Sequence, residues 1–199
     1  MNNYEYIISS LPVLSKDARP GDASAEDVLA FIRSQLSPKD NALVDLLLRG
    51  HDETKLGEAF YKEALASRDP FIREYFRFDL NLRNAKVRYL NKALGRPADQ
   101  DIFMEPDGIF AEKARAEAVL ATGDILGRER GIDDLRWEKI LALNVFDYFN
   151  IDTILGFIAR EQIIERWVRL DEQTGRELFR RLVDEVRGTF KGVEFNDKQ

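Results

Sequence analysis

The sequence predicts an all-α protein, and three observations carry this prediction. Apolar residues recur along most of the chain at the i, i+3, i+4, i+7 spacing of amphipathic helices. Proline, glycine and N-cap residues occur at intervals typical of helix ends. The alternating pattern of a β-strand bounded by hairpin turns is absent. With 199 residues, the chain is long enough to bury a core. We therefore expect residues 1–199 to form a single all-α domain, a multi-helix bundle of two packed lobes.

The first part of the chain contains four expected helices. The first is short, and its apolar face consists of Tyr4, Ile7, Ile8 and Leu11. Ser24 caps the second helix. The buried face of that helix consists of Val28, Leu29, Phe31, Ile32 and Leu36. The third begins at Ser37-Pro38, a cap followed by an N1 proline, and ends at Gly50. The fourth spans residues 53–66.

The longest predicted helix spans residues 68–96. Asp69-Pro70 marks its start and Gly95 marks its end. It contains eight basic and three acidic residues, whereas the whole chain has a formal charge of −6. Two adjacent apolar stripes cover more than half of its circumference, which predicts packing against neighbours on two sides. We therefore expect this helix to be a central element of the fold.

The polar residues of this helix form two groups. Asp79 and Arg83 lie between the apolar stripes, and their i, i+4 spacing predicts a partly buried ion pair. The opposite, polar arc consists of Arg73, Arg77, Asn84 and Arg88. This basic arc is either a solvated face or a docking surface, and the pattern favours neither. As a docking surface, it assigns partner binding to Arg73, Arg77 and Arg88.

The loop at residues 96–106 is the expected boundary between lobes 1–95 and 107–199. A helix at residues 110–122 follows it, and residues 125–131 are expected to be a short connection. Three further helices then begin at Asp133-Asp134, Asp152 and Asp171. The first of these three runs through Phe149 and the second ends near Leu170. The last carries an apolar face of Leu178, Phe179, Leu182, Val183, Val186 and Phe190.

The composition argues against several classes of function. A charge of −6 disfavours nucleic acid as a partner, because phosphate binding needs a strongly basic face. No apolar run approaches the ~20 residues that cross a bilayer, and the N-terminus lacks the basic region of a secretion signal. The chain contains no cysteine, which fits a reducing compartment. We therefore expect a cytoplasmic protein with no nucleic-acid partner and no direct membrane insertion.

Catalytic signals are sparse. His51 is the only histidine, and it lies at a helix boundary, where a histidine more often interacts with the helix end. Glu161 and Glu165 stand one turn apart, the spacing of an acid/base or metal-binding pair. Such pairs are common on solvated helix faces, and Arg160 and Arg166 are close enough to neutralise them. No phosphate-binding glycine loop is present. We therefore expect no catalytic residue, no metal and no cofactor.

Two polar residues lie among apolar neighbours at helical spacing. Asn144 is surrounded by leucine, valine and phenylalanine, and Arg160 by isoleucine and tryptophan. Polar groups within or at the edge of a core need hydrogen-bond partners. A structural role is therefore favoured over a catalytic one for both residues.

Two segments resemble a known family. The opening NYEYIISSLPVLSKD and the closing FNIDTILGFIAREQIIERWVRLDEQTGRELFRRLVDEV resemble a bacterial family of unknown function, usually associated with the V/A-type ATPase. In addition, FDLNLRNAKVRY at residues 78–89 is similar to a pattern of the C-type subunit of that machine (the d-type subunit in eukaryotic complexes). The matching positions are Asp79, Asn81 and Arg88. FNIDTILGFIAR at residues 149–160 is similar to a second copy, with Asp152 and Arg160 in the comparable places.

These C-type subunits of V/A-type ATPases are all-α, funnel-shaped and non-enzymatic, and they link the central shaft to the membrane rotor ring. The resemblance therefore implies the fold of a C-type subunit and a non-catalytic coupling or adaptor role in a proton- or sodium-translocating V/A-type ATPase. The implied partners are the shaft and rotor-ring subunits, with the protein peripheral at the inner face of the membrane. One alternative is a stand-alone helical scaffold or regulator that uses the same basic arc. An enzyme using Glu161 and Glu165 with a divalent metal is the least favoured alternative.

Overall fold

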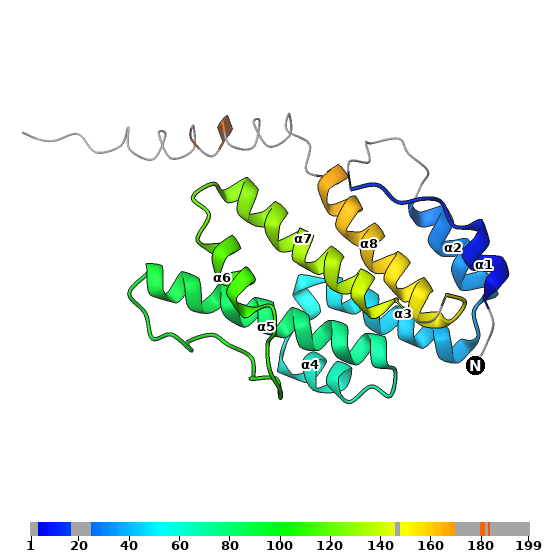
Figure 1. Cartoon of the computed structure of the whole chain (residues 1–199), viewed down its shortest axis with the longest axis horizontal. Helices are drawn as coiled ribbons and strands as arrows, with labels where there is room; N and C mark the ends of the chain where they lie inside the picture. The colour runs from blue at the N-terminus through cyan, green and yellow to red at the C-terminus, as the bar shows by residue number, and fades with distance from the viewer. Residues whose placement is uncertain (1–3, 17–24, 146–147, 170–179, 182, 184–199) are drawn as a thin grey trace, which may run out of the picture.

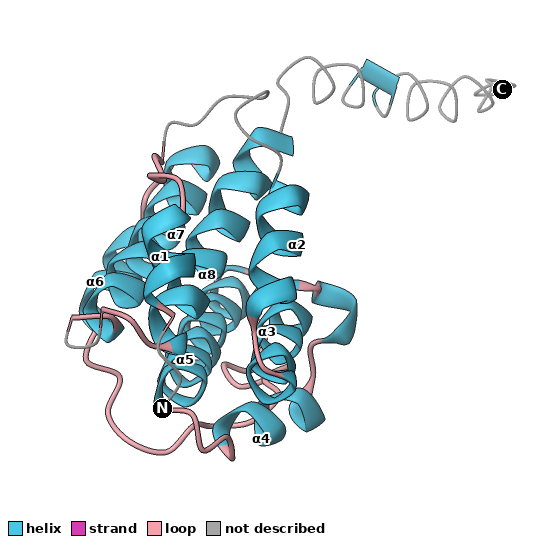
Figure 2. Cartoon of the chain, turned by 90° about the vertical axis from the view of Figure 1, so that its right-hand side faces the viewer, coloured by secondary structure: helices cyan, strands magenta, loops and turns pink. Residues whose placement is uncertain are grey.

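A computed structural model describes residues 4–16, 25–145, 148–169, 180, 181 and 183. Every regular element within these residues is a helix, which confirms the predicted all-α class (Figures 1 and 2). The elements are α1 (Glu5–Ser10), α2 (Ala25–Gln35), α3 (Pro38–His51), the 3-10 helix η1 (Glu53–Lys55), α4 (Glu58–Leu65), α5 (Pro70–Ala93), α6 (Lys113–Leu120), α7 (Ile125–Leu143) and α8 (Ile151–Arg169).

Two predicted N-caps explain where α3 and α5 begin. The Ser37 hydroxyl accepts a hydrogen bond from the backbone N–H of Asp40 at 3.2 Å. The Asp69 carboxylate accepts from the backbone N–H of Ile72 at 2.9 Å. A proline follows each cap in the first turn, where its missing N–H costs nothing. At the other end of α5, Gly95 takes a positive φ of 66° that favours glycine. These boundaries are confirmed within three residues.

The predicted helix at residues 53–66 is instead two elements, η1 and α4. The Asp52 side chain accepts from the backbone N–H of Thr54 at 3.1 Å and so caps a single 3-10 turn. Leu56 then adopts an extended conformation, and α4 starts after Gly57. The prediction of one continuous helix was therefore wrong, because the extended backbone at Leu56 separates the 3-10 turn from α4.

The predicted connection at residues 125–131 is also wrong, since these residues form the first turns of α7. Asp124 caps this helix by accepting from the backbone N–H groups of Leu126 (3.3 Å) and Gly127 (2.7 Å). The helix then continues through Gly131, which lies close to Val119 of α6. Gly127 and Gly131 both lie within this helix, and Gly131 packs against α6. α7 ends at Leu143 rather than at residue 149.

The cap of α8 also differs from the prediction. The backbone N–H of Thr153 donates to the side chain of Asn150 at 3.2 Å, so Asn150 takes the capping role expected for Asp152. Asp152 lies in the first turn instead, where a carboxylate interacts favourably with the helix dipole. The predicted cap at Ser24 and the predicted helix start at Asp171 lie outside the described residues.

Two hydrophobic clusters are arranged along α5, which crosses the middle of the molecule in Figure 1. The larger cluster combines α1 to α4, α7 and α8 with the N-terminal half of α5. The smaller cluster consists of Phe78 and Leu82 of α5, Ala116 and Leu120 of α6, and Ile132 and Leu135 of α7. The expectation that the long helix packs against neighbours on two sides is therefore confirmed.

The hydrophobic contacts run across the loop that was expected to separate two lobes. The larger cluster contains Phe71 and Tyr75 from before the loop and Ile154 and Ile158 from after it. The backbone N–H of Tyr4 also donates to the carbonyl of residue 149 at 2.9 Å. The division into lobes 1–95 and 107–199 stays a prediction. Within the described part of the chain, no helix is long and apolar enough to cross a membrane.

Candidate functional site

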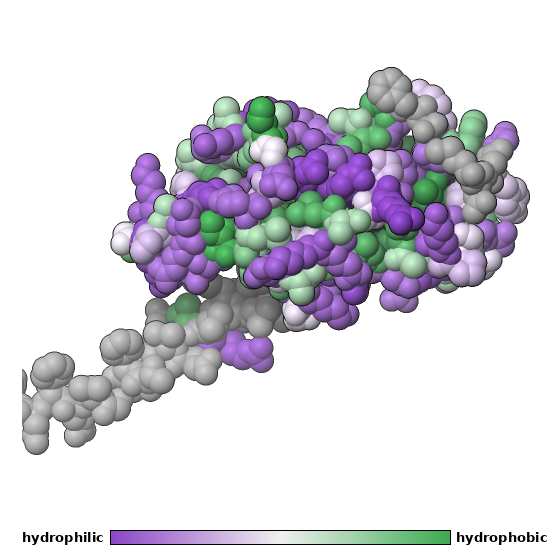
Figure 3. All heavy atoms as spheres, turned by 90° about the horizontal axis from the view of Figure 1, so that it is seen from below, coloured by the Kyte–Doolittle hydropathy of each residue, from purple (hydrophilic) through white to green (hydrophobic). Residues whose placement is uncertain are grey.

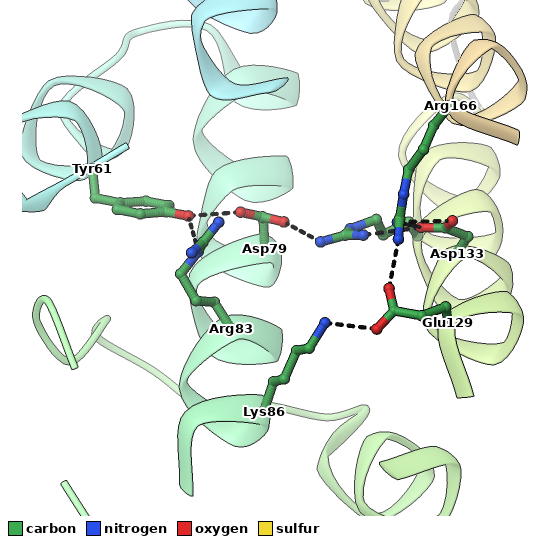
Figure 4. Close-up of polar contacts among 8 residues, drawn as sticks. Tyr61, Asp79, Arg83, Lys86, Glu129, Asp133 and Arg166 are labelled. Atoms are coloured by element: carbon green, nitrogen blue, oxygen red, sulfur yellow. Dashed lines mark hydrogen bonds and ion pairs between the residues drawn. The ribbon is translucent and has the colours of Figure 1, made fainter. Parts of the chain in front are cut away.

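Two features of α5 are candidates for function: a network of charged side chains and a groove. The network joins α4, α5, α7 and α8, and Figure 4 shows its members pointing toward one another between these helices. We call it the interhelical network, and it consists of Tyr61, Asp79, Arg83, Lys86, Glu129, Asp133, Arg136 and Arg166.

Asp79 is the centre of the network on α5, and only 7 % of it is exposed. Its carboxylate accepts from the hydroxyl of Tyr61 at 2.7 Å and from the guanidinium of Arg136 at 3.2 Å. Arg83 donates from Nε to the same Tyr61 hydroxyl at 3.2 Å. The predicted Asp79–Arg83 ion pair is therefore wrong. Arg136 reaches Asp79 from α7, and Tyr61 lies between Asp79 and Arg83.

Asp133 is the corresponding acidic centre on α7, with 4 % of it exposed. It accepts from Arg136 at 2.9 Å, from Arg166 at 3.1 Å and from the indole N–H of Trp167 at 2.8 Å. These bonds tie α8 to α7, while the bond between Arg136 and Asp79 ties α7 to α5. Burial opposes the positive charge of Arg136, but Asp79 and the other acidic groups around it outweigh burial and raise its pKa. The Arg136 guanidinium therefore stays ionised between two carboxylates.

Glu129 extends the network toward the C-terminal half of α5. It accepts from Lys86 at 2.7 Å and from Arg166 at 2.5 Å. Burial alone would raise the pKa of Glu129, but the hydrogen bonds from both cations outweigh burial and lower it. The carboxylate is therefore ionised wherever the protein is folded near neutral pH.

A cavity of about 100 Å³ opens beside the network, between α3, η1, α5, α7 and α8. His51 lines it, and the Nε2 atom of His51 is buried with no hydrogen-bond partner among the described residues. The ring of His51 stacks on Tyr75 at 6.2 Å between centroids. Burial, followed by the nearby charge of Arg136, lowers the pKa of His51 to about 4. The imidazole is therefore neutral at neutral pH.

The second feature is a groove of about 930 Å³ along the C-terminal half of α5. We call it the α5–α6 groove. Its apolar lining comes from Ala85, Tyr89, Ala93, Pro106, Phe110, Leu120 and Ala121. Its charged lining comes from Arg88, Lys92, Glu105, Lys113 and Glu117. Figure 3 views the molecule from below, and on that face hydrophilic and hydrophobic residues alternate in small patches rather than forming one continuous apolar area.

Side chains of α5 fix the loop that forms one wall of this groove. Asn84 donates to the carbonyl of Met104 at 2.9 Å, and Asn91 donates to the carbonyls of Ala98 and Gln100 at 3.1 and 2.7 Å. Asn84 is 1 % exposed, so this member of the predicted polar arc does not lie on a solvated face. The groove is held open by buried amides rather than by loop residues alone.

The predicted partner-binding arginines differ in their surroundings. Arg73 and Arg77 both pair with Glu74, at 3.4 and 2.7 Å. Arg88 pairs with Asp99 at 2.8 Å and also with Glu105, and it lines the groove. All three side chains are about one third exposed. The basic arc thus carries acidic partners along its length.

Asn81 has a place in the groove as well. Its amide donates to the backbone carbonyl of Arg77, one turn earlier, at 3.0 Å, and its side chain lines the groove. The three positions that match the ATPase pattern are therefore divided between the two features. Asp79 belongs to the interhelical network, whereas Asn81 and Arg88 belong to the groove.

A family model described as a protein of unknown function (DUF2764) matches residues 1–56 and 115–189, more than half of the chain. The chain belongs to the DUF2764 family. Neither the curated proteins nor the solved structures gave a match. The family description carries no activity and no partner, so the resemblance to the V/A-type ATPase rests on the sequence motifs alone.

The two DUF2764 segments supply only part of each feature. In the network they contain Glu129, Asp133, Arg136 and Arg166, while residues 57–114 contain the other members. Most of the groove is also formed by residues 57–114. The contacts of Asp133 therefore join α7 to α8 within a matched segment, and those of Asp79 join that segment to the unmatched one.

Asn144 and Arg160 lie within the second DUF2764 segment, at the meeting of α7 and α8. Asn144 ends α7, and its amide packs so closely on Gly156 that a Cβ there would lie 1.8 Å from Nδ2. Arg160 donates to the carbonyl of Gly156 at 3.2 Å, and its guanidinium lies 5.4 Å from the ring centroid of Trp137. Burial lowers the pKa of Arg160. Both side chains make contacts between or within helices.

Glu161 does not lie on the solvated face that its spacing suggested. It is 7 % exposed, and burial, with a smaller effect of Glu165, raises its pKa to about 7. Arg166, an expected neutralising partner, is directed toward Glu129 and Asp133 instead. Within the described residues, no group of three or more histidine or acidic side chains is placed to hold a metal ion.

Sequence reasoning missed most of the network because its partners are far apart in the chain. Asp79 and Arg136 are separated by 57 positions, and no local spacing connects them. One signal was available at Asp133, which stands between the apolar residues Ile132 and Leu135 of a helix. A carboxylate on an apolar helix face needs a buried partner, and that argument would have singled it out.

Proposed function

We propose that this protein is a non-catalytic helical adaptor that binds a partner protein in the α5–α6 groove. The observation that carries this proposal is the groove itself. Its volume of about 930 Å³ far exceeds that of the cavity beside the network, and its lining combines an apolar floor with charged side chains at the edge. Such a lining is typical of grooves that receive the apolar face of an amphipathic helix.

The charges of the groove favour a partner helix with acidic side chains. Lys92 is exposed and makes no ion pair within the described residues, and Lys113 is 3.9 Å from its only ion-pair partner there, Glu117. Arg88 lies one turn from Lys92, and Arg77 and Arg73 continue the same face of α5 beyond the groove. Arg88, Lys92 and Lys113 thus present a basic edge beside the apolar lining of the groove.

The resemblance at residues 78–89 and 149–160 gives this adaptor a setting, the V/A-type ATPase. In that setting the groove receives a helix of the central shaft, and the protein couples the shaft to the membrane rotor ring. The protein is then peripheral at the inner face of the membrane through its partners. The all-α fold and the position of Asn81 and Arg88 in the groove support this proposal.

Co-purification from the native host tests the proposal. A tagged protein is expected to retain shaft and rotor-ring subunits in amounts that exceed those retained by a Lys92→Glu, Lys113→Glu double variant. If those subunits never accompany the wild-type protein, the ATPase setting fails. A different acidic partner that depends on the same two lysines supports the stand-alone scaffold instead. If every captured protein binds the double variant equally well, the groove is not the docking surface.

A further inference from the structure

The cavity beside the interhelical network is distinct from the groove and has an unusual lining. Its charged and titratable lining comes from all the elements packed around it, namely His51, Glu53, Tyr75, Asp79, Arg83, Asp133, Arg136 and Arg166. A volume of about 100 Å³ is several times the 10–15 Å³ or so that one water molecule needs on the same measure. The cavity therefore has room for a small molecule rather than a single water.

Two polar groups of this cavity have hydrogen-bonding capacity that no described residue uses. The Nε2 atom of His51 is buried without a partner among the described residues. Arg83 donates from Nε to Tyr61, but its guanidinium makes no ion pair with any described carboxylate. Buried polar atoms are almost always paired, and a guanidinium presents a planar fork that matches an oxyanion. The guanidinium of Arg83 can therefore donate to an acceptor in the cavity, and Nε2 of His51 can do so in the tautomer that carries its proton there.

The balance of charges in the interhelical network also favours an anionic ligand. The network contains four cations, of which Lys86, Arg136 and Arg166 all pair with carboxylates. The three carboxylates Asp79, Glu129 and Asp133 are shared among those three cations, which leaves Arg83 as the excess charge. Glu53 also lines the cavity, but it is exposed, so water and salt screen its charge.

We propose that this cavity binds a small oxyanion, a carboxylate or phosphate group, held by Arg83 and by Nε2 of His51. A metal cation is disfavoured because the buried carboxylates of the lining, Asp79 and Asp133, already pair with Arg136 and Arg166. A carboxylate and a phosphate offer the same acceptor geometry to the arginine fork. The site is independent of the groove, so its failure would leave the proposed adaptor function standing.

The chain offers a direct probe of this site, because His51 is its only histidine. Its ring protons give single, unambiguous NMR signals. We expect sodium phosphate or sodium acetate, each added at constant ionic strength against a sodium chloride reference, to shift the Cε1–H signal in a saturable way. The bound anion is also expected to raise the pKa of His51 from about 4 by roughly one unit, equivalent to tenfold tighter binding to the imidazolium form.

Three variants make the test specific. Arg83→Gln is expected to abolish the saturable shift, and Arg83→Lys, which keeps the charge without the fork, is expected to weaken it. Arg77→Gln, which removes an arginine that pairs with Glu74 outside the cavity, is expected to leave the shift unchanged. A shift with phosphate alone assigns a phosphate site, and one with acetate alone assigns a carboxylate site. No saturable shift with either anion, or an equal shift in Arg83→Gln, overturns the proposal.

Discussion

The two halves of α5 have the same amphipathic pattern but different surroundings. Most buried side chains of the N-terminal half belong to the larger cluster, and Phe71, Ile72 and Phe76 are at most 1 % exposed. In the C-terminal half, the smaller cluster covers one side, the groove opens beside it, and Leu90 is 44 % exposed. The N-terminal half of α5 is thus mainly part of the core, whereas the C-terminal half also contributes to the accessible surface of the groove. The interhelical network lies where the two halves meet.

The largest expected effect comes from breaking the network at that junction. Asp133→Asn removes a buried carboxylate and leaves Arg136 with Asp79 as its one carboxylate partner among the described residues. Removing one member of a buried ion pair costs about 3 to 5 kcal/mol. We expect a loss of that size in the free energy of unfolding, measured by urea denaturation.

Asp134→Asn is the matched control for this substitution. Asp134 is the next residue of α7, but its side chain is 54 % exposed and pairs with Lys16 at the surface. An exposed pair contributes about 0 to 1 kcal/mol. Equal losses for the two variants would show that the buried network contributes no more to stability than an exposed ion pair.

Protonation of His51, which lies beside the larger cluster, is expected to lower the free energy of unfolding by a smaller amount. Because the pKa of His51 falls from 6.5 to about 4 in the folded protein, the unfolded chain binds the extra proton between these values. Stability therefore decreases as the pH falls through this window, by about 2 to 3 kcal/mol at pH 4. Urea denaturation in chloride buffer at pH 7 and pH 4 measures it. His51→Gln should lack this share of the acid sensitivity, and an unchanged pH dependence would refute the assignment.

Ionisation of Glu161 is expected to change stability with pH in the opposite direction to protonation of His51. Its folded-state pKa is raised from 4.5 to about 7, so the folded protein holds a proton that the unfolded chain has lost. Stability therefore decreases as the pH rises from 4.5 through 7. Glu161→Gln removes this loss and should stabilise the protein at pH 8 by about 1 to 3 kcal/mol. A variant no more stable than wild type at pH 8 would contradict the burial of this carboxylate.

Substitutions at two glycines, one beside each hydrophobic cluster, can compare how tightly the two clusters are packed. A Cβ at Gly50 would lie 2.2 Å from Phe76 and 2.9 Å from Phe60, both in the larger cluster. A Cβ at Gly131 would lie 2.7 Å from a methyl of Val119, a half-buried side chain at the smaller cluster. Overpacking costs about 1 to 3 kcal/mol, whereas replacing a helical glycine with alanine gains up to about 1 kcal/mol.

We therefore expect Gly50→Ala to lower the midpoint of thermal unfolding and Gly131→Ala to change the free energy of unfolding by less than about 1 kcal/mol. The rings at Gly50 belong to the buried side chains of Phe60 and Phe76, whereas Val119 beside Gly131 is only partly buried and can shift more easily. The reverse order of effects would mean that the smaller cluster is the more tightly packed.

The sequence predicts the helices well because their signals are local. The caps at Ser37 and Asp69 lie within three residues of the groups they bind. The start of α7 was missed although its cap at Asp124 is local, and Gly131 in this part of the helix packs against α6. The partner of Asp79 was missed because it lies on another helix. Local chemistry was visible in the sequence, whereas contacts between helices required the fold.

The groove could not have been predicted for a similar reason. It needs the loop after α5 to be held by Asn84 and Asn91, and both residues look like ordinary polar positions of a helix. The predicted arginines fall on the correct face of α5, but only Arg88 of the three lines the groove. The spacing of charged residues identifies a helix face, and the neighbouring elements determine which part of that face is accessible.

The most direct test of the division of α5 compares two charge-reversal pairs in co-purification from the native host. Lys92→Glu with Lys113→Glu alters the groove, and Arg73→Glu with Arg77→Glu alters the opposite half of the same helix face. We expect the groove pair to reduce the captured partner at least tenfold, with unfolding free energy within about 1 kcal/mol of wild type. The Arg73 and Arg77 pair is expected to reduce it less than threefold. Full retention of the partner by the groove pair, with loss in the other, would contradict the account.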